Sequence, residues 1–139
     1  MAILVFGSAG QLAQSLRETQ QGGESFFVDR NSCDLADPEQ VDAMLERRKP
    51  GVIINAAAYT AVDKAEEEPG LAHLINEASV RRMAAYAHAN NARLIHLSTD
   101  FVFDGTNQSP YLPGDPAAPL AEYGASKLAG ELAALQEAP

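Results

Sequence analysis

A tyrosine and a lysine near the C-terminal end of the sequence are spaced to do acid–base chemistry together. Tyr123 and Lys127 are four residues apart in the segment EYGASKLAGELAALQEAP, residues 122–139. This spacing puts two side chains on one face of a helix, one turn apart. A nearby ammonium group favours the phenolate form, so it can lower the pKa of a tyrosine from its ordinary value of about 10. The pair suits proton transfer, although most such pairs are only surface contacts on a helix.

A hydroxyl side chain is expected at the same site. Ser98 and Thr99 come at the end of the apolar segment ARLIHLS, residues 92–98. Open α/β sheets bind their ligands at the carboxyl ends of the strands, and this segment has the composition of a buried strand. A hydroxyl there, together with a Tyr-x-x-x-Lys helix, indicates carbonyl reduction.

A glycine-containing loop connects the first apolar run to the first expected helix in FGSAGQLA, residues 6–13. Gly7 would permit a tight turn, and Gly10 would let the backbone approach a pyrophosphate resting on the helix N-terminus. Ala13 stands where a third glycine can occur and is small enough for close packing. A turn that binds no ligand is the alternative, because glycine pairs are common in loops.

The residues after the second apolar run bear on the choice of cofactor. Asp29 lies where an acid hydrogen-bonds the adenosine ribose hydroxyls, which favours NADH. Arg30 follows directly and could pair with a 2′-phosphate, which favours NADPH. The cofactor is therefore expected to be NADPH or NADH, and the sequence leaves the two open.

The elements that must position these residues alternate between strands and helices. Buried apolar runs, typical of strands, occupy residues 2–6, 25–29, 51–58 and 92–98. A helical pattern follows each run, at residues 11–20, 37–48, about 63–90 with an interruption at Pro69, and from about Leu120. The second of these helices has Asp37 as its N-cap and an inward face of Val41, Met44 and Leu45. This order predicts an α/β fold of the Rossmann type, a doubly wound parallel sheet covered by helices on both faces. We expect about five strands in the order 3-2-1-4-5, within one NAD(P)-binding domain at residues 1–139.

Composition excludes several other classes of function. The chain has 139 residues and a net charge of −9, which disfavours nucleic acid as a partner. No apolar run is long enough to cross a membrane, and Cys33 is the single cysteine, so a reducing, cytoplasmic location is expected. The three histidines are far apart and show no zinc-like spacing.

Four segments taken together resemble one known family. They are GSAGQLA, NAAAYTAVDKAE, HLSTDFVFDG and PLAEYGASKLAGE, which begin at residues 7, 55, 96 and 119. They are similar to the dTDP-4-dehydrorhamnose reductase family, in the extended branch of the short-chain dehydrogenase/reductase superfamily. NAAAYTAVDKAE is the most specific of the four. The resemblance covers essentially the whole chain, and the motifs occur in the family's order.

This resemblance implies an activity and a set of residue roles. A nicotinamide cofactor would reduce the C4 ketone of dTDP-4-dehydro-L-rhamnose to give dTDP-L-rhamnose. Tyr123 would donate the proton, Lys127 would lower its pKa and hold the nicotinamide ribose, Thr99 would hydrogen-bond the ketone, and Asp100 would lie beside the sugar. The cofactor would be bound by Gly7, Gly10, Gln11 and Leu12 at the pyrophosphate, Asp29 and Arg30 at the ribose, Asp34 and Leu35 at the adenine, and Ala58, Tyr59 and Thr60 along the channel. Asn76 matches an asparagine position of the superfamily, where a structural role is equally open.

The chain also departs from the family pattern. Pro113 stands where a glutamate is usual in the loop before the tyrosine, and Ala121 stands where asparagine is frequent. Both positions lie near the sugar, so substrate identity is less certain than cofactor use. Ser15 occupies the region where magnesium-binding members place a glutamate, so no metal is expected.

The family's proteins have a C-terminal half that adds strands and grips the nucleotide-sugar. We therefore expect this chain to be a truncated form, a proteolytic fragment or the product of a gene that ends early, with impaired activity. A non-catalytic dinucleotide-binding or regulatory subunit of the same fold is the alternative, and a Rossmann fragment without ligand is a third. The run at 92–98 would be an unpaired edge strand, which invites self-association.

Overall fold

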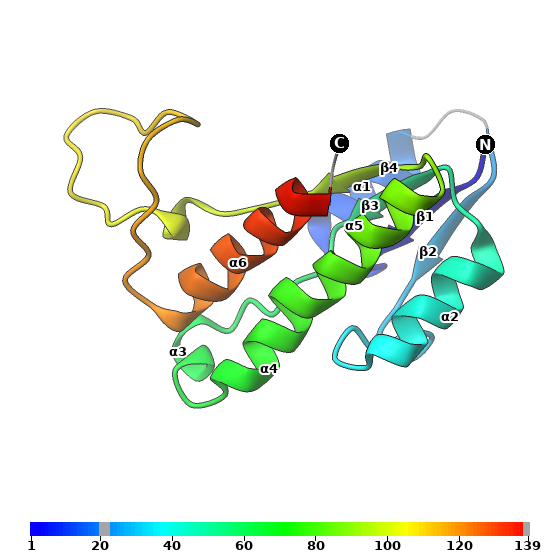
Figure 1. Cartoon of the computed structure of the whole chain (residues 1–139), viewed down its shortest axis with the longest axis horizontal. Helices are drawn as coiled ribbons and strands as arrows, with labels where there is room; N and C mark the ends of the chain where they lie inside the picture. The colour runs from blue at the N-terminus through cyan, green and yellow to red at the C-terminus, as the bar shows by residue number, and fades with distance from the viewer. Residues whose placement is uncertain (20–22, 138–139) are drawn as a thin grey trace.

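The computed structural model of the chain describes residues 1–19 and 23–137. Strands and helices alternate along it, as the apolar runs predict (Figure 1). In chain order the elements are β1 (Ile3–Phe6), α1 (Gln11–Thr19), β2 (Ser25–Val28), α2 (Pro38–Arg48), β3 (Val52–Asn55), α3 (Val62–Ala65), α4 (Pro69–His73), the π-helix η1 (Leu74–Ala78), α5 (Ser79–Ala89), β4 (Arg93–His96), the 3-10 helix η2 (Asp100–Val102) and α6 (Glu122–Glu137).

The sheet is parallel throughout and has the order β2-β1-β3-β4. The Rossmann-type fold is confirmed, but the expectation of about five strands in the order 3-2-1-4-5 is wrong for the described residues. The observed order is the expected one without its outermost strand. A further parallel strand between β2 and α2 would need a crossover connection of a dozen or more residues. Only residues 29–37 lie between the end of β2 and the start of α2. Those residues form turns instead, in which Ser32 and Cys33 donate their backbone N–H groups to the Asp29 carbonyl.

Helices cover both faces of the sheet unequally. Figure 1 shows α1 behind the sheet and α2, α5 and α6 in front of it. The step from β1 to β2 runs across the sheet in the opposite direction to the steps from β2 to β3 and from β3 to β4. Right-handed connections therefore put α1 on one face and the later helices on the other.

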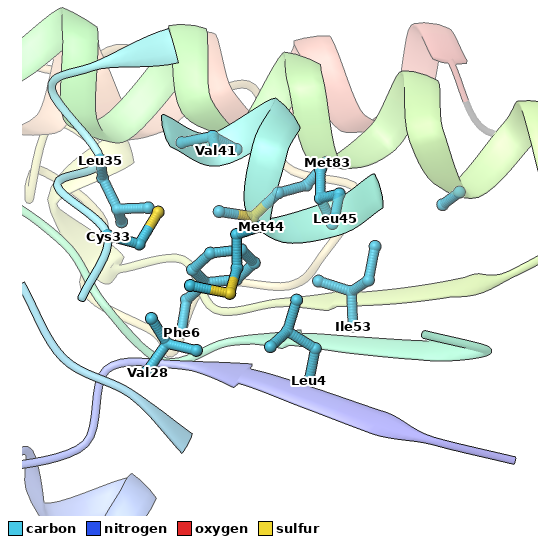
Figure 2. Packing of buried hydrophobic residues seen from close by; sticks show 11 residues of the cluster. Leu4, Phe6, Val28, Cys33, Leu35, Val41, Met44, Leu45, Ile53 and Met83 are labelled. Atoms are coloured by element: carbon cyan, nitrogen blue, oxygen red, sulfur yellow. The ribbon is translucent and has the colours of Figure 1, made fainter. Parts of the chain in front are cut away.

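The main core lies between the sheet and the helices α2 and α5 (Figure 2). Each side chain of this size contributes roughly 1.5–3 kcal/mol when it is fully buried. The predicted inward face of α2 is confirmed, because its three apolar residues are all buried. The labelled core side chains are Leu4, Phe6, Val28, Cys33, Leu35, Val41, Met44, Leu45, Ile53 and Met83.

The start of α2 is fixed as the sequence predicts. The Asp37 carboxylate accepts hydrogen bonds from the backbone N–H groups of Glu39 at 3.0 Å and Gln40 at 3.4 Å. Pro38 takes the first helical position, where its missing N–H costs nothing. The Gln40 side chain also donates to Asp37 Oδ2 at 2.9 Å, which holds the capping carboxylate in place.

The helical region expected at 63–90 is broken as predicted, and it contains a feature that the pattern did not predict. Pro69 begins α4 after a break at residues 66–68. The chain then passes through the π-helix η1 before it continues as α5. The last strand is shorter than the expected run 92–98, since only Arg93–His96 pair with β3.

Candidate cofactor and active site

Nine of the predicted cofactor residues line one cleft above the carboxyl ends of β1, β2 and β3. The cleft has a volume of about 560 Å³. Loops that follow three separate strands meet here, at the edge of the sheet where α/β folds bind ligands. The nine residues are Gly7, Gly10, Asp29, Arg30, Asp34, Leu35, Ala58, Tyr59 and Thr60.

The two glycines of the loop after β1 differ in what a side chain at their position would contact. Gly7 has a φ of +94°, and a Cβ atom there would lie 3.0 Å from the Ala56 carbonyl oxygen. A Cβ atom at Gly10 would meet nothing within 4 Å, so this backbone is open to a ligand in the cleft. Gln11 and Leu12 begin α1 and are not among the residues lining the cleft, so their assignment to the pyrophosphate stays a prediction.

Asp29 and Arg30, which follow β2, each form a polar contact with a nearby residue. Asp29 Oδ1 accepts from the Ser32 backbone N–H at 2.8 Å and from the Ser32 hydroxyl at 2.7 Å. The hydrogen bonds from Ser32 lower the pKa of Asp29, so this side chain is a fixed carboxylate at neutral pH. Arg30 Nε donates to Asp34 Oδ2 at 3.3 Å, and the Arg30 side chain is largely exposed.

Lys127 is only 2% exposed, which distinguishes it from a surface lysine. Its Nζ donates to the Leu97 carbonyl oxygen at 2.5 Å and lies 3.5 Å from His96 Nε2. Burial lowers the pKa of Lys127, while the Glu131 carboxylate acts in the opposite direction. A buried lysine costs free energy unless its polar head is paired or hydrogen-bonded, and the Leu97 carbonyl oxygen supplies such a hydrogen bond here.

Tyr123 is half-buried one turn before Lys127. Its ring contacts Phe101 edge to face, with centroids 5.4 Å apart and planes at 74°. Gly124 lets α6 approach this segment, because a Cβ atom there would collide with the Phe101 carbonyl oxygen. The short helix η2 after β4 therefore fixes the start of the Tyr-x-x-x-Lys helix.

Thr99 and Asp100 line a second, larger hollow of about 1180 Å³ beside β4, α5 and α6. Thr99 Oγ1 accepts from the Phe101 backbone N–H at 3.3 Å, which caps η2. The expected hydroxyl thus lies at the carboxyl end of β4. The structure does not bring it into the cleft with the cofactor residues, and Tyr123 and Lys127 line neither hollow in the described part of the chain.

Asn76 connects the cofactor cleft to the Tyr-x-x-x-Lys helix. Its Oδ1 accepts from the Tyr59 backbone N–H at 2.8 Å, and its Nδ2 donates to the Tyr59 carbonyl at 3.1 Å and to Ser126 Oγ at 3.0 Å. The Ser126 hydroxyl donates to the Tyr123 carbonyl at 2.8 Å. The backbone carbonyl of Asn76 packs where a Cβ at Gly130 would collide. The sequence leaves a site role and a structural role open for Asn76. The structure shows that its side chain holds the Tyr59 backbone and α6 in position.

Sequence reasoning did not assign a role to three residues of this neighbourhood: Asn55, His96 and Ser126. His96 was considered only as a metal ligand, yet it ends an apolar strand, where a polar side chain is unusual. Asn55 likewise ends β3 and is 1% exposed. A polar residue at the carboxyl end of an otherwise apolar run is a sequence signal that could have found both.

Residues 1–19 and 23–137 contain no group of three or more His, Cys, Asp or Glu side chains placed to hold a metal ion. None of their helices has the length and apolar character needed to cross a membrane.

A parallel sheet whose strand ends surround a cleft with an open glycine turn defines a Rossmann-type dinucleotide-binding fold. Within that class, the family model RmlD substrate binding domain matches residues 1–139, and the chain belongs to this family.

Similar proteins come from several bacteria. The dTDP-4-dehydrorhamnose reductase of Burkholderia thailandensis strain E264 is 45% identical over 134 residues, which are 96% of this chain and 45% of that protein. A solved dTDP-4-dehydrorhamnose reductase from Clostridium acetobutylicum superposes with a TM-score of 0.94 at 36% identity, covering 100% of this chain and 50% of the other. The Bacillus anthracis reductase, solved in complex with NADP, gives a TM-score of 0.92 at 34% identity, covering 99% and 50%. The chain thus spans about half the length of the relatives it matches.

Proposed function

We propose that residues 1–139 supply the NAD(P)H-binding part and the proton-transfer residues of a reductase for dTDP-4-dehydro-L-rhamnose. The observation that supports this most strongly is the buried Lys127, four residues after Tyr123 on a helix tied by Asn76 to the wall of the cofactor cleft. A lysine pairing of only structural value would not require burial of an ammonium group. A cytoplasmic location is part of this proposal, since the single cysteine is free and buried.

The residues present fit a dinucleotide. The cleft has an open backbone at Gly10 next to the N-terminus of α1, which favours a pyrophosphate. Asp29 is a carboxylate suited to ribose hydroxyls, and Arg30 is a cation suited to a 2′-phosphate. The NADP bound by the Bacillus anthracis relative is consistent with this assignment.

In the proposed reaction the bound cofactor supplies the hydride for the C4 ketone. Thr99 donates a hydrogen bond to the ketone oxygen, and Asp100 contacts the sugar. Tyr123 gives its phenolic proton to the alkoxide that forms, and Lys127 stabilises the phenolate left behind by its positive charge. Gly7, Gly10, Gln11 and Leu12 hold the pyrophosphate, and the remaining cleft residues hold the ribose and the adenine.

Titration of the chain with NADPH and NADH, followed by cofactor fluorescence, tests the binding half of this proposal. We expect a saturable change with at least one cofactor, and a weaker one in Gly10→Ala than in the control Gly70→Ala. Both glycines have open space around the Cβ position, but Gly70 lies in α4 away from the cleft. No change with either cofactor would exclude dinucleotide binding by this chain.

Oxidation of NADPH in the presence of the keto-sugar tests the catalytic half, with Tyr123→Phe as the inactive comparison. Binding without turnover would favour the second candidate, a dinucleotide-binding or regulatory subunit. That candidate is supported by the separation of Thr99 and Asp100 from the cofactor cleft and by the length of the chain relative to the reductases it matches.

A further inference from the structure

The N-terminal end of α6, directly before Tyr123, lacks a capping side chain of its own. The Ala121 carbonyl accepts the first hydrogen bond of the helix, from the Ala125 N–H at 2.9 Å, so Ala121 takes the N-cap position. The N–H groups of a first turn have no partner within the helix, and an alanine has no side-chain oxygen to accept from them. An acceptor for the first of these groups therefore has to come from outside α6.

Glu66 supplies this acceptor from a distant segment. Its Oε1 atom accepts from the Glu122 backbone N–H at 2.8 Å, and the two residues are 56 positions apart in the chain. Glu66 directly follows α3, which packs beside the start of α6 (Figure 1). A carboxylate at this place satisfies the N–H group, and its negative charge is also favourable at the N-terminus of a helix.

The side chain of Glu122 makes a second, weaker contact at the same end of α6. Its Oε2 atom lies 3.8 Å from His73 Nε2 on α4, and His73 Nδ1 lies 2.6 Å from Glu77 Oε2. These side chains are 30–41% exposed, and ion pairs open to solvent contribute little. The hydrogen bond from the Glu122 N–H to Glu66 is therefore the main contact that fixes this end of the helix from outside.

Glu66 is also close in the chain to the cofactor cleft. Tyr59 and Lys64 line the cleft, and only one residue separates Lys64 from Glu66. The segment 59–66 thus leads from the wall of the cleft to the first backbone N–H of α6. Asn76 holds the same helix at Ser126, one turn further along. The start of α6 is therefore tied to the cleft wall at two successive turns.

We propose that Glu66 is a positioning residue, which caps α6 from outside the helix and so fixes the place of Tyr123 relative to the cofactor cleft. This inference rests on the proposed function for its consequence in catalysis, because Tyr123 is the proposed proton donor. The cap itself can be measured without cofactor or substrate, so its outcome is independent of the proposed reaction.

Amide hydrogen exchange, followed for each residue by NMR, tests the cap. The first N–H groups of a helix have no intrahelical partner, so slow exchange at Glu122 in the unaltered chain would indicate the outside acceptor. We expect this exchange to become roughly fivefold faster in Glu66→Ala, as for the loss of a helix cap of ordinary strength. Glu66→Gln keeps an oxygen acceptor and should retain most of the protection, and the exposed control Glu67→Ala should retain all of it. Equal exchange at Glu122 in Glu66→Ala and Glu67→Ala would overturn the proposal.

The place of Tyr123 is measured separately, from its ring. The Tyr123 and Phe101 rings meet edge to face with centroids 5.4 Å apart, so the chemical shifts of their ring protons depend on how the two rings lie. We expect these shifts to change in Glu66→Ala and to stay near their original values in Glu66→Gln and Glu67→Ala. Unchanged ring shifts in Glu66→Ala would refute the positioning role.

Two further results keep the inference separate from folding and from the proposed reaction. If Glu66→Ala does not fold, the Glu122 amide of the unaltered chain decides, and free exchange there would refute the cap. If the unaltered chain turns over the keto-sugar, Glu66→Ala should lower kcat while the KM for NADPH hardly changes. A chain with a protected Glu122 amide and no turnover would support the cap and contradict the proposed reaction alone.

Discussion

Asn76 donates through Nδ2 to the Ser126 hydroxyl at 3.0 Å, and this hydrogen bond joins residues 50 positions apart in the chain. With the two hydrogen bonds to Tyr59, it uses both N–H donors and the carbonyl oxygen of the Asn76 amide. The wall of the cofactor cleft and the helix of Tyr123 and Lys127 are therefore held by one side chain.

Replacement of Asn76 by alanine should destabilise the chain. It leaves the Tyr59 backbone N–H and carbonyl without their side-chain partner and removes the donor to the Ser126 hydroxyl, and a buried polar group without its hydrogen bond costs about 1–3 kcal/mol. Urea unfolding should show a loss of this size in the free energy of unfolding. Asn107→Ala, in an exposed loop, should change it by less than about 0.5 kcal/mol. Equal effects of the two substitutions would argue against the positioning role of Asn76.

Alanine at Gly7 and at Gly10 should separate stability from binding. Gly7→Ala forces a side chain into a left-handed conformation and against the Ala56 carbonyl, so we expect a loss of stability of about 1–3 kcal/mol. Gly10→Ala has room for its methyl group and should fold normally, yet bind NADPH more weakly. Thermal unfolding and fluorescence titration measure the two effects. Normal cofactor affinity in Gly10→Ala would place the pyrophosphate elsewhere.

Asp29 and Arg30 should set the preference between the two cofactors in opposite directions. Arg30→Gln removes a cation from the 2′-phosphate position, and a hydrogen bond to a charged group is worth about 1.5 kcal/mol, or roughly a tenfold change in the affinity for NADPH. Affinity for NADH should hardly change. Arg17→Gln is the matched control, because that arginine contacts the Phe27 ring away from the cleft. A parallel loss of both cofactors in Arg30→Gln would mean that Arg30 acts through Asp34.

Acid should destabilise the fold partly through His96. Its folded pKa is about 4, below the ordinary value of 6.5, so the unfolded chain binds the proton more readily between these values. The contribution of His96 to stability is fully present above pH 6.5 and decreases as the pH falls toward 4. Stability measured by urea unfolding across this window should decrease less steeply in His96→Gln than in the unaltered chain. The exposed His88→Gln should follow the unaltered chain, and matching slopes in all three would refute the assignment.

The outer edge of β4 should promote self-association. The strand pairs only with β3 in the described residues, and Ile95 is 51% exposed. Unpaired apolar edges tend to pair with another chain, and a charge on the strand prevents this. Light scattering should show a mass above that of the monomer at micromolar concentrations and a lower one for Ile95→Lys. A monomeric mass for the unaltered chain throughout this range would rule out association through β4.

Local features of the fold could be predicted because their causes are local. The apolar runs gave the four strands, and Asp37 with Pro38 gave the start of α2, since a cap and a buried face each depend on a few adjacent residues. The fifth strand was expected from the fold class alone, and residues 29–37 form turns instead. The cleft residues could be placed because they follow strands. The hydrogen bond from Asn76 to Ser126 and the contacts of His96 with Asn55 and Lys127 could not, because they depend on tertiary packing between distant segments.

The π-helix at Leu74–Ala78 gives this part of the chain a tolerance to changes in length. A π-turn accommodates one residue more than an α-helical turn, so the helices on either side of it keep their phase. Deletion of one residue of η1 other than Asn76 would let the segment close into a regular α-helix, and Val80, Met83 and Ala84 of α5 would stay against the sheet. A deletion inside α5 itself would turn the residues that follow it by about 100° and is therefore expected to be worse tolerated.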